Sequence, residues 1–167
     1  FLTTRSMTGS LYLASALLFV SMGQLIVLLT AGIDLSVGPL TGLTVVILSF
    51  FCGDGQGVGD LILGFGLAFA TALAVGFANG FMVRKIGLTP VIATLSTYIG
   101  LQGVALLLRS TPAGYFRTDI TSALTARLGP LPYVFIIGIV IAVAGEWALR
   151  RTRFGMELRA IGSNELA

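Results

Sequence analysis

Asp34 is the residue whose type and position most clearly call for a chemical explanation. It lies in the stretch AGIDLSVGP (residues 31–39), which interrupts an apolar run that extends over residues 11–52. A carboxylate and a helix break are both unfavourable in hydrocarbon, because the charge and the freed backbone groups need polar partners. We therefore expect Asp34 to face protein or a water-filled cavity. With Ser36, it would either line a path for a polar solute or stabilise the break through backbone contacts, and we favour the structural role.

Several common kinds of catalytic chemistry are excluded by the composition. The chain has no His and a single Cys, Cys52, so it cannot build a His-dependent triad, a Cys/His zinc site or an internal disulfide. The glycine-rich stretch GDGQGVGD (residues 53–60) does not match a nucleotide-binding fingerprint, and no G-x-x-x-x-G-K-[ST] motif occurs. We expect no enzyme activity, no cofactor and no metal site.

The elements that must position these residues are membrane helices. Hydrophobic residues make up 56% of the chain and charged residues only 10%, against about a quarter in soluble domains. The pattern predicts an all-α, polytopic transmembrane bundle with about five spans, over residues 10–33, 37–52, 61–83, 88–108 and 130–149. The second run is short for a span of about 20 residues. The first two runs therefore either both cross the membrane or meet as a broken pair at mid-depth.

The ends of these helices can also be predicted. Ser10 is the expected N-cap of the first helix. Because proline suits the first helical turn, Pro39 favours Ser36 or Gly38 as the N-cap of the second. Small residues at every fourth position of the third run predict close helix packing, at Gly64, Ala68, Ala72, Gly76 and Gly80.

The basic residues lie at the ends of the apolar runs, which favours a membrane protein over a nucleic-acid-binding one. Their bias places the chain end in the cytoplasm, together with Arg84, Lys85, Arg150, Arg151, Arg153 and Arg159. The long segment 109–129 then lies outside, and its arginines are available to a soluble partner.

Three stretches resemble a known family. They are AGIDLSVGP (31–39), with Ala31 where Gly is usual; ANGFMVRKIGLTPVIATLSTYIGLQG (78–103), with Gln102 where Arg is frequent; and RTRFGMELRAIGSNELA (151–167), with Met156 in place of a basic residue. Together they resemble permease subunits of bacterial ABC sugar importers of the ribose/xylose/galactose type, in the branched-chain-amino-acid/ribose permease superfamily. The resemblance implies that residues 1–167 are a single transmembrane domain from the N-terminal half to two-thirds of a longer, multi-pass inner-membrane permease.

The resemblance also implies a function and partners. A periplasmic binding protein would deliver a monosaccharide, a pentose, hexose or related polyol. ABC ATPase subunits would hydrolyse ATP, and a second permease subunit, identical or different, would complete the pair within the lipid. Candidate residues of the substrate path are Gln24, Asp34, Ser36, Asn79, Thr94, Ser96, Thr97 and Gln102. Uncharged side chains supply both donors and acceptors to sugar hydroxyls, but each of them could instead bond between helices.

Two contact regions complete the expectation. Residues 154–167 resemble a cytoplasmic coupling segment that docks on the ATPase, with Gly155 allowing a change of direction; its candidates are Gly155, Glu157, Arg159, Gly162, Asn164 and Glu165. The alternative is a solvated tail at the membrane edge. The outer arginines Arg109, Arg117 and Arg127 are candidates for the binding-protein contact.

Two rival functions remain open at this point. One is an ion-coupled secondary transporter or channel, in which Asp34 is the proton or cation site. The other is a purely structural membrane subunit.

Overall fold

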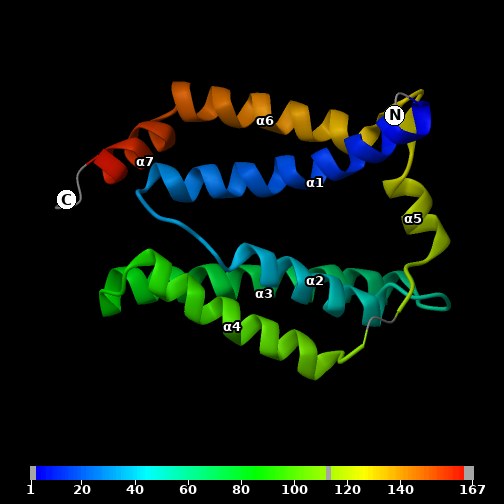
Figure 1. Ribbon diagram of the computed structural model, residues 1–167, viewed down its shortest axis with the longest axis horizontal. Coiled ribbons are helices and arrows are strands. Elements are labelled where there is room, and N and C mark those ends of the chain that lie inside the picture. The colour runs from blue at the N-terminus through cyan, green and yellow to red at the C-terminus, as the bar shows by residue number, and fades with distance from the viewer. Residues whose placement is uncertain (1–2, 112–113, 164–167) are drawn as a thin grey trace. The chain divides into compact units, whose positions relative to one another are not determined.

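The computed structural model describes residues 3–111 and 114–163, and it divides into two compact units. The terminal unit comprises residues 1–32 and 121–167, and the central unit comprises residues 33–120. Figure 1 shows the elements of both, which are described separately below.

Membrane-spanning helices dominate the described residues, as predicted. Four helical segments are long and apolar enough to cross a membrane: Arg5–Leu29, Val58–Ile86, Pro90–Leu108 and Tyr133–Arg151. A fifth apolar helix, Val37–Phe51, is shorter. Large apolar side chains such as Leu17, Phe77 and Val140 are exposed on these helices, as expected where lipid is the solvent. The prediction of an all-α transmembrane bundle is confirmed, with one two-stranded ladder added.

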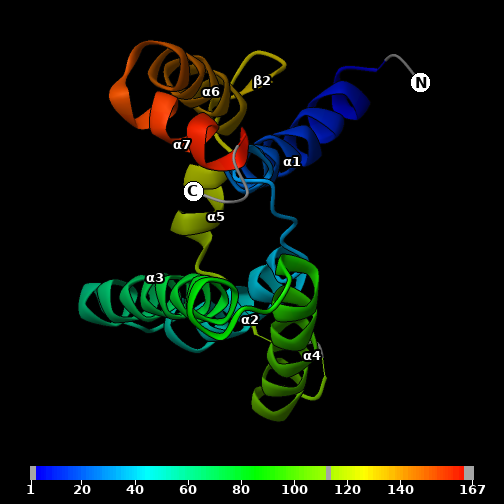
Figure 2. The same cartoon turned by 90° about the vertical axis from the view of Figure 1, so that its left-hand side faces the viewer.

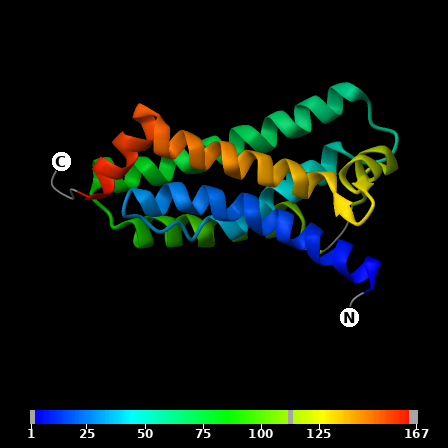
Figure 3. The ribbon, with the colours of Figure 1, turned by 90° about the horizontal axis from the view of Figure 1, so that it is seen from above.

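In the terminal unit, α1 (Thr4–Leu29) packs along α6 (Tyr133–Arg151), and the two helices run in the same direction (Figures 1 and 3). Gly138 makes this approach possible, because an added Cβ would lie 2.9 Å from a methyl carbon of Leu18. The strands β1 (Arg127–Leu128) and β2 (Leu131–Pro132) form the ladder before α6. The short helix α5 (Thr118–Leu124), whose first three residues belong to the central unit, precedes it.

The start of α1 differs from the prediction. Thr3 is the N-cap, and its hydroxyl oxygen accepts a hydrogen bond from the backbone N–H of Ser6 at 3.3 Å. Ser10 is exposed within the helix. The helix therefore extends beyond its apolar part into polar sequence, because Thr3 can satisfy the first backbone N–H groups.

In the central unit, α2 (Val37–Phe51) lies between α3 (Val58–Phe81) and α4 (Pro90–Leu108), as Figure 2 shows. Gly64 faces α2 closely, since an added Cβ would lie 2.6 Å from Phe51 Cβ. Gly64 and Ala68 are buried, whereas Gly76 and Gly80 are exposed. Only the first half of the predicted small-residue ridge is therefore packed closely against another helix.

The connection from α3 to α4 is compact. The π-helical turn Met82–Ile86 contains Arg84 and Lys85, and Gly87 ends it with a φ of 82°. Thr89 caps α4 through a hydrogen bond from Ile92 N–H at 3.4 Å. This turn marks the basic end of the central unit.

The last helix, α7 (Arg153–Ser163), follows α6 after Thr152, whose backbone is extended. Gly155 was expected to provide the change of direction, but it lies within the first turn of α7 and is buried. An added Cβ there would lie 2.5 Å from Leu149 Cα. Gly155 is needed for close packing, and the chain turns at Thr152 instead.

Candidate functional site

The helix break begins with a complete C-terminal cap on α1. The N–H of Gly32 donates to Val27 O at 3.1 Å and that of Ala31 to Leu28 O at 3.0 Å, which is the pattern of a Schellman motif. Ala31 has a φ of 59°. It therefore occupies the left-handed position that usually takes glycine.

Residues 33–36, the break segment, join this cap to α2. Ser36 is the N-cap of α2, one of the two residues that the sequence proposed. Its backbone N–H donates to Asp34 Oδ1 at 2.8 Å, and its hydroxyl donates to the same oxygen at 2.6 Å. Asp34 thus bonds the backbone and side chain that start α2.

Thr94, on α4, satisfies backbone groups of the break segment. Its Oγ1 accepts from Leu35 N–H at 3.1 Å and lies 3.2 Å from Ile33 O and 2.8 Å from Pro90 O. A non-helical backbone in a membrane protein needs such partners, since hydrocarbon supplies none.

Asn79, on α3, links the break segment to a second residue of α4. Its side-chain N–H donates to Ser36 Oγ at 3.0 Å, and its Oδ1 accepts from Thr97 Oγ1 at 2.8 Å. The exposed fractions are 1% for Ser36, 4% for Thr94 and 7% for Asn79. We refer to Asp34, Ser36, Asn79, Thr94 and Thr97 as the break cluster. Thr97 donates to Asn79, Asn79 donates to Ser36, and Ser36 donates to the Asp34 carboxylate.

The break cluster lies near the basic end of the central unit. Asn79 is five residues before Arg84, or roughly 8 Å along a helix axis. Thr94 is in the first turns of α4. Within this unit the break therefore lies toward one end of α3 and α4, and α1 is long enough to cross a membrane.

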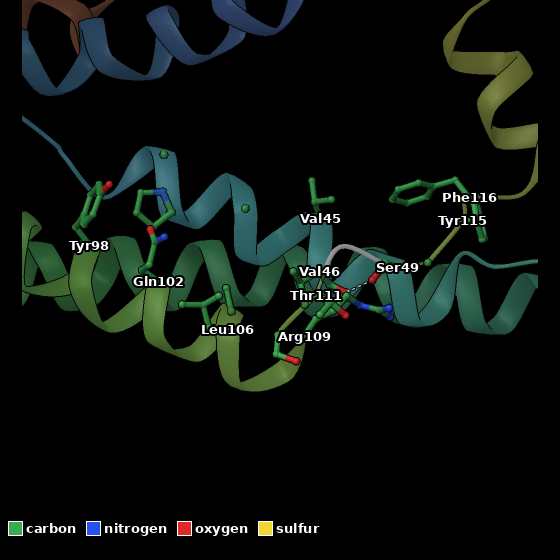
Figure 4. A pocket seen from close by; sticks show the side chains of 16 residues that line it. Val45, Val46, Ser49, Tyr98, Gln102, Leu106, Arg109, Thr111, Tyr115 and Phe116 are labelled. Atoms are coloured by element: carbon green, nitrogen blue, oxygen red, sulfur yellow. Dashed lines mark hydrogen bonds between the residues drawn. The ribbon is translucent and has the colours of Figure 1, made fainter.

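A groove runs between α2 and α4 with a volume of about 750 Å³ (Figure 4). It starts beside the break segment at Gly38 and Pro39, where the absence of bulky side chains on α2 leaves space. On the α4 side, it is lined by Tyr98, Gln102 and Leu106, which share one helical face. The size and the mixed lining are typical of a small-molecule site.

Arg109 lies at the far end of the groove. Its guanidinium carbon is 4.5 Å from the centre of the Phe50 ring. Its Nε is buried, and among the described residues no acceptor lies within hydrogen-bonding distance of it. Of the described residues that line the groove, Arg109 is the one that carries a charge.

The structure thus brings together five of the eight residues expected to form the substrate path, and it places Gln102 in the adjacent groove. Ser96 is exposed and donates to Ile92 O at 2.8 Å, and Gln24 is half-buried on α1 in the terminal unit. Tyr98 and Ser49 also line the groove and were missed. The spacing of Tyr98 and Gln102, one helical turn apart, was the signal that could have found Tyr98.

Of the outer arginines, Arg117 is engaged within its own unit. Its Nε and Nη2 bond the carboxylate of Asp119 at 3.0 and 2.5 Å, and Nη1 donates to Gln56 O at 2.8 Å. The hydrogen bond from Arg117 holds the pKa of Asp119 below its usual value. Arg127 is exposed on β1 in the terminal unit. The three arginines expected to contact the binding protein therefore lie in different environments: Arg109 in the groove, Arg117 in an ion pair and Arg127 on an exposed strand.

The residues expected to contact the ATPase also differ in whether they face this chain or are exposed. An added Cβ at Gly162 would collide with the carbonyl of Leu29, and Arg159 donates to Gly155 O at 3.3 Å and to Leu149 O. These residues face their own chain, as does Gly155. Glu157 is exposed, whereas Asn164 and Glu165 lie outside the described residues. The apolar side chains that α7 leaves exposed are Phe154, Met156 and Ile161.

In residues 3–111 and 114–163, no three His, Cys, Asp or Glu side chains gather as metal ligands would.

Known proteins resemble the chain along nearly all of its length. The D-allose transport system permease protein AlsC of Escherichia coli K12 is 28% identical over 172 residues, 99% of this chain and 50% of the relative. The autoinducer 2 import system permease protein LsrC of Yersinia pestis (strain Pestoides F) is 30% identical over 157 residues, 90% of this chain and 42% of the relative. A probable ABC transporter permease protein, y4mJ, of Sinorhizobium fredii is 32% identical over 155 residues, 90% of this chain and 45% of the relative.

The chain thus spans about half the length of the curated relatives it matches. No solved structure matches it. Its apolar helices and these relatives make it a multi-pass protein of the bacterial inner membrane. Residues 6–167 match a family described as the permease component of branched-chain amino acid transport systems, and the chain belongs to that family.

Proposed function

We propose that the chain is part of the transmembrane subunit of an ABC importer that translocates a monosaccharide or a related polyol. The relatives named for allose and autoinducer 2 transport support this class of solute. The observation within the structure that carries the proposal is the groove between α2 and α4, where the polar residues Gln102 and Tyr98 line the wall together with apolar residues. Such a lining suits a ring with hydroxyl groups.

The break cluster has a defined part in this proposal. It fixes the start of α2, and the groove begins two to three residues later, at Gly38 and Pro39. A shift of the break segment would therefore change the width of that end of the groove. The side chains of Asp34 and Asn79 act by positioning α2, and they need not touch the solute.

ATP would be hydrolysed by separate ATPase subunits, because the sequence contains no phosphate-binding loop. A periplasmic binding protein and a second permease subunit complete the proposed assembly. We place the ATPase contact on the exposed face of α7, at Phe154, Met156 and Glu157. Gly155 and Gly162 support that face from behind, through their contacts with Leu149 and Leu29.

Obstructing the groove tests the proposed path. An added Cβ at Gly42 on α2 meets nothing within 4 Å, so Gly42→Leu should fold and project into the groove. Gly100 on α4 has the same free space but does not line the groove, and Gly100→Leu is the matched control. In the full-length permease assembled with its partners, we expect Gly42→Leu to lower ATP-dependent sugar uptake several-fold and Gly100→Leu to preserve it. Equal uptake by the two variants would contradict the assignment of the path.

The coupling face has its own test. Cysteines at Met156 and at Ser163, both exposed, should crosslink to the ATPase, whereas a cysteine at Leu17, exposed on α1, should not. Crosslinks at none of these positions would contradict the docking of α7 on the ATPase.

A further inference from the structure

We propose that Arg109 makes the groove between α2 and α4 selective for a solute that carries a carboxylate beside its hydroxyl groups, such as a uronic or aldonic acid. The inference rests on the proposed function, because it assigns the class of solute that the same groove takes.

The hydrogen bonds of Arg109 are incomplete. Its Nε is buried without an acceptor among the described residues. The two ion pairs found in that part of the chain join Arg117 to Asp119 and Arg150 to Glu146. A guanidinium is always charged and offers five donors, and leaving a buried charged donor unsatisfied is unfavourable. Because the buried Nε is closed to solvent, a solute in the groove would meet the guanidinium at its outer nitrogens, Nη1 and Nη2.

Arg117, in the same unit, is an arginine whose side chain is fully hydrogen-bonded within the protein, and it can be compared with Arg109. All three of its side-chain nitrogens have acceptors, on the Asp119 carboxylate and the carbonyl of Gln56. These contacts hold the segment after α4 against the loop between α2 and α3. Arg109 has no comparable carboxylate among the residues that line the groove. The carboxylate of a bound ligand could therefore take the position that Asp119 takes beside Arg117.

The position of Phe50 sets the direction from which a ligand binds. The ring stands 4.5 Å from the guanidinium carbon and covers one face of the group. The strong donors of a guanidinium lie in its plane, where they form a fork that matches the two oxygens of a carboxylate. A neutral hydroxyl would engage only one arm of this fork, which is why we assign a carboxylate.

The remainder of the groove suits the rest of such a solute. Gln102 lies on α4, seven residues before Arg109, which is the C-cap residue of that helix and has an extended backbone. Figure 4 shows the guanidinium of Arg109 at the opposite end of the groove from Gln102 and directed away from it, with Leu106, Val45 and Val46 between them. The groove thus offers a guanidinium at one end for the carboxylate, apolar side chains for the ring, and Gln102 on the α4 side for hydroxyl groups.

The test uses the full-length permease, purified in detergent, and follows its thermal unfolding midpoint with D-galactose and D-galacturonate as probes. We expect galacturonate to stabilise the wild type at a concentration at least about ten-fold lower than galactose, which corresponds to about 1.4 kcal/mol. Arg109→Gln should remove this preference, and Arg109→Lys, which keeps the charge but loses the fork, should reduce it. Arg127→Gln, an exposed arginine of the terminal unit, should retain it.

Each other outcome has a definite meaning. Equal stabilisation of the wild type by both sugars, or an unchanged preference in Arg109→Gln, would overturn the carboxylate assignment and leave the sugar-permease proposal standing. Stabilisation by phosphatidylglycerol but not by galacturonate would assign the oxyanion to a lipid headgroup and also overturn it. Failure of both sugars to bind, with no uptake in the assembled transporter, would contradict the proposed function as well.

Discussion

The side-chain amide nitrogen of Asn79 lies 3.0 Å from the hydroxyl oxygen of Ser36, and this contact joins the end of α3 to the start of α2. The two residues are 43 positions apart in the sequence and both are buried. Because Asn79 also accepts from Thr97 on α4, one side chain connects three helices at the break.

Replacing Asn79 should therefore destabilise the central unit. Asn79→Leu removes two interhelical hydrogen bonds, each of which contributes about 0.6–1.7 kcal/mol in membrane proteins. We expect a loss of roughly 1–3 kcal/mol, measured by thermal unfolding of the full-length permease in detergent. Ser96→Ala, which removes a bond only within α4, is the control and should change stability little. Equal stability of the Asn79 variant and the wild type would show that the cluster does not hold the break.

Asp34 should tolerate an amide better than an apolar side chain. Its Oδ1 accepts two hydrogen bonds from Ser36, and the amide oxygen of Asn can accept both. We expect Asp34→Asn to express as folded protein with altered transport, and Asp34→Leu to express poorly. Asp54→Leu, in the exposed loop after α2, is the matched control. Normal transport by Asp34→Leu would exclude both a capping and a solute-lining role.

Ala31 should be improved by glycine. Its φ of 59° places an L-residue in the left-handed region, which costs about 1–2 kcal/mol. We expect Ala31→Gly to raise stability by roughly 1 kcal/mol after the greater freedom of glycine in the unfolded chain is included. Gly87→Ala, at a φ of 82°, should have the opposite effect in the same unfolding assay. A destabilising Ala31→Gly would mean that the α1 cap differs from the one described.

The Arg117–Asp119 pair predicts a pH dependence in the segment after α4. The pKa of Asp119 is lowered, chiefly by its hydrogen bond from Arg117. Its stabilising effect is therefore fully present above the ordinary value of 3.8 and is lost as pH falls through the lower folded pKa. We expect cleavage of this segment by an acid-active protease to rise below that pH in the wild type. Asp119→Asn should be cleaved at a rate that does not follow this titration, and a parallel rise in both proteins would contradict the anchor.

The helices themselves were predictable because their patterns are local. The second helix was expected over residues 37–52 and occupies Val37–Phe51, since Pro39 must lie near its start and Ser36 can cap it. The end at Leu108 was also placed correctly. In each case, the apolar run and the residues next to it carry the whole signal.

The contacts that define the site were not predictable in this way. Thr94 reaches Leu35, 59 positions earlier in the chain, and no local pattern reports such a pairing. Gly162 was expected to face the ATPase, yet it lies against the carbonyl of Leu29. A glycine that permits a turn and one that permits close packing look alike in sequence, and only the neighbouring helix distinguishes them.

ATP-dependent uptake in proteoliposomes tests the central claim most directly. The full-length permease would be reconstituted with its ATPase and binding protein, and uptake of a radiolabelled monosaccharide would be followed with and without ATP on the ATPase side. We predict that uptake requires ATP and the binding protein and is unaffected by a collapsed proton or sodium gradient. Uptake that is driven by an ion gradient without ATP, and that is abolished in Asp34→Asn, would contradict the importer account and make Asp34 an ion site.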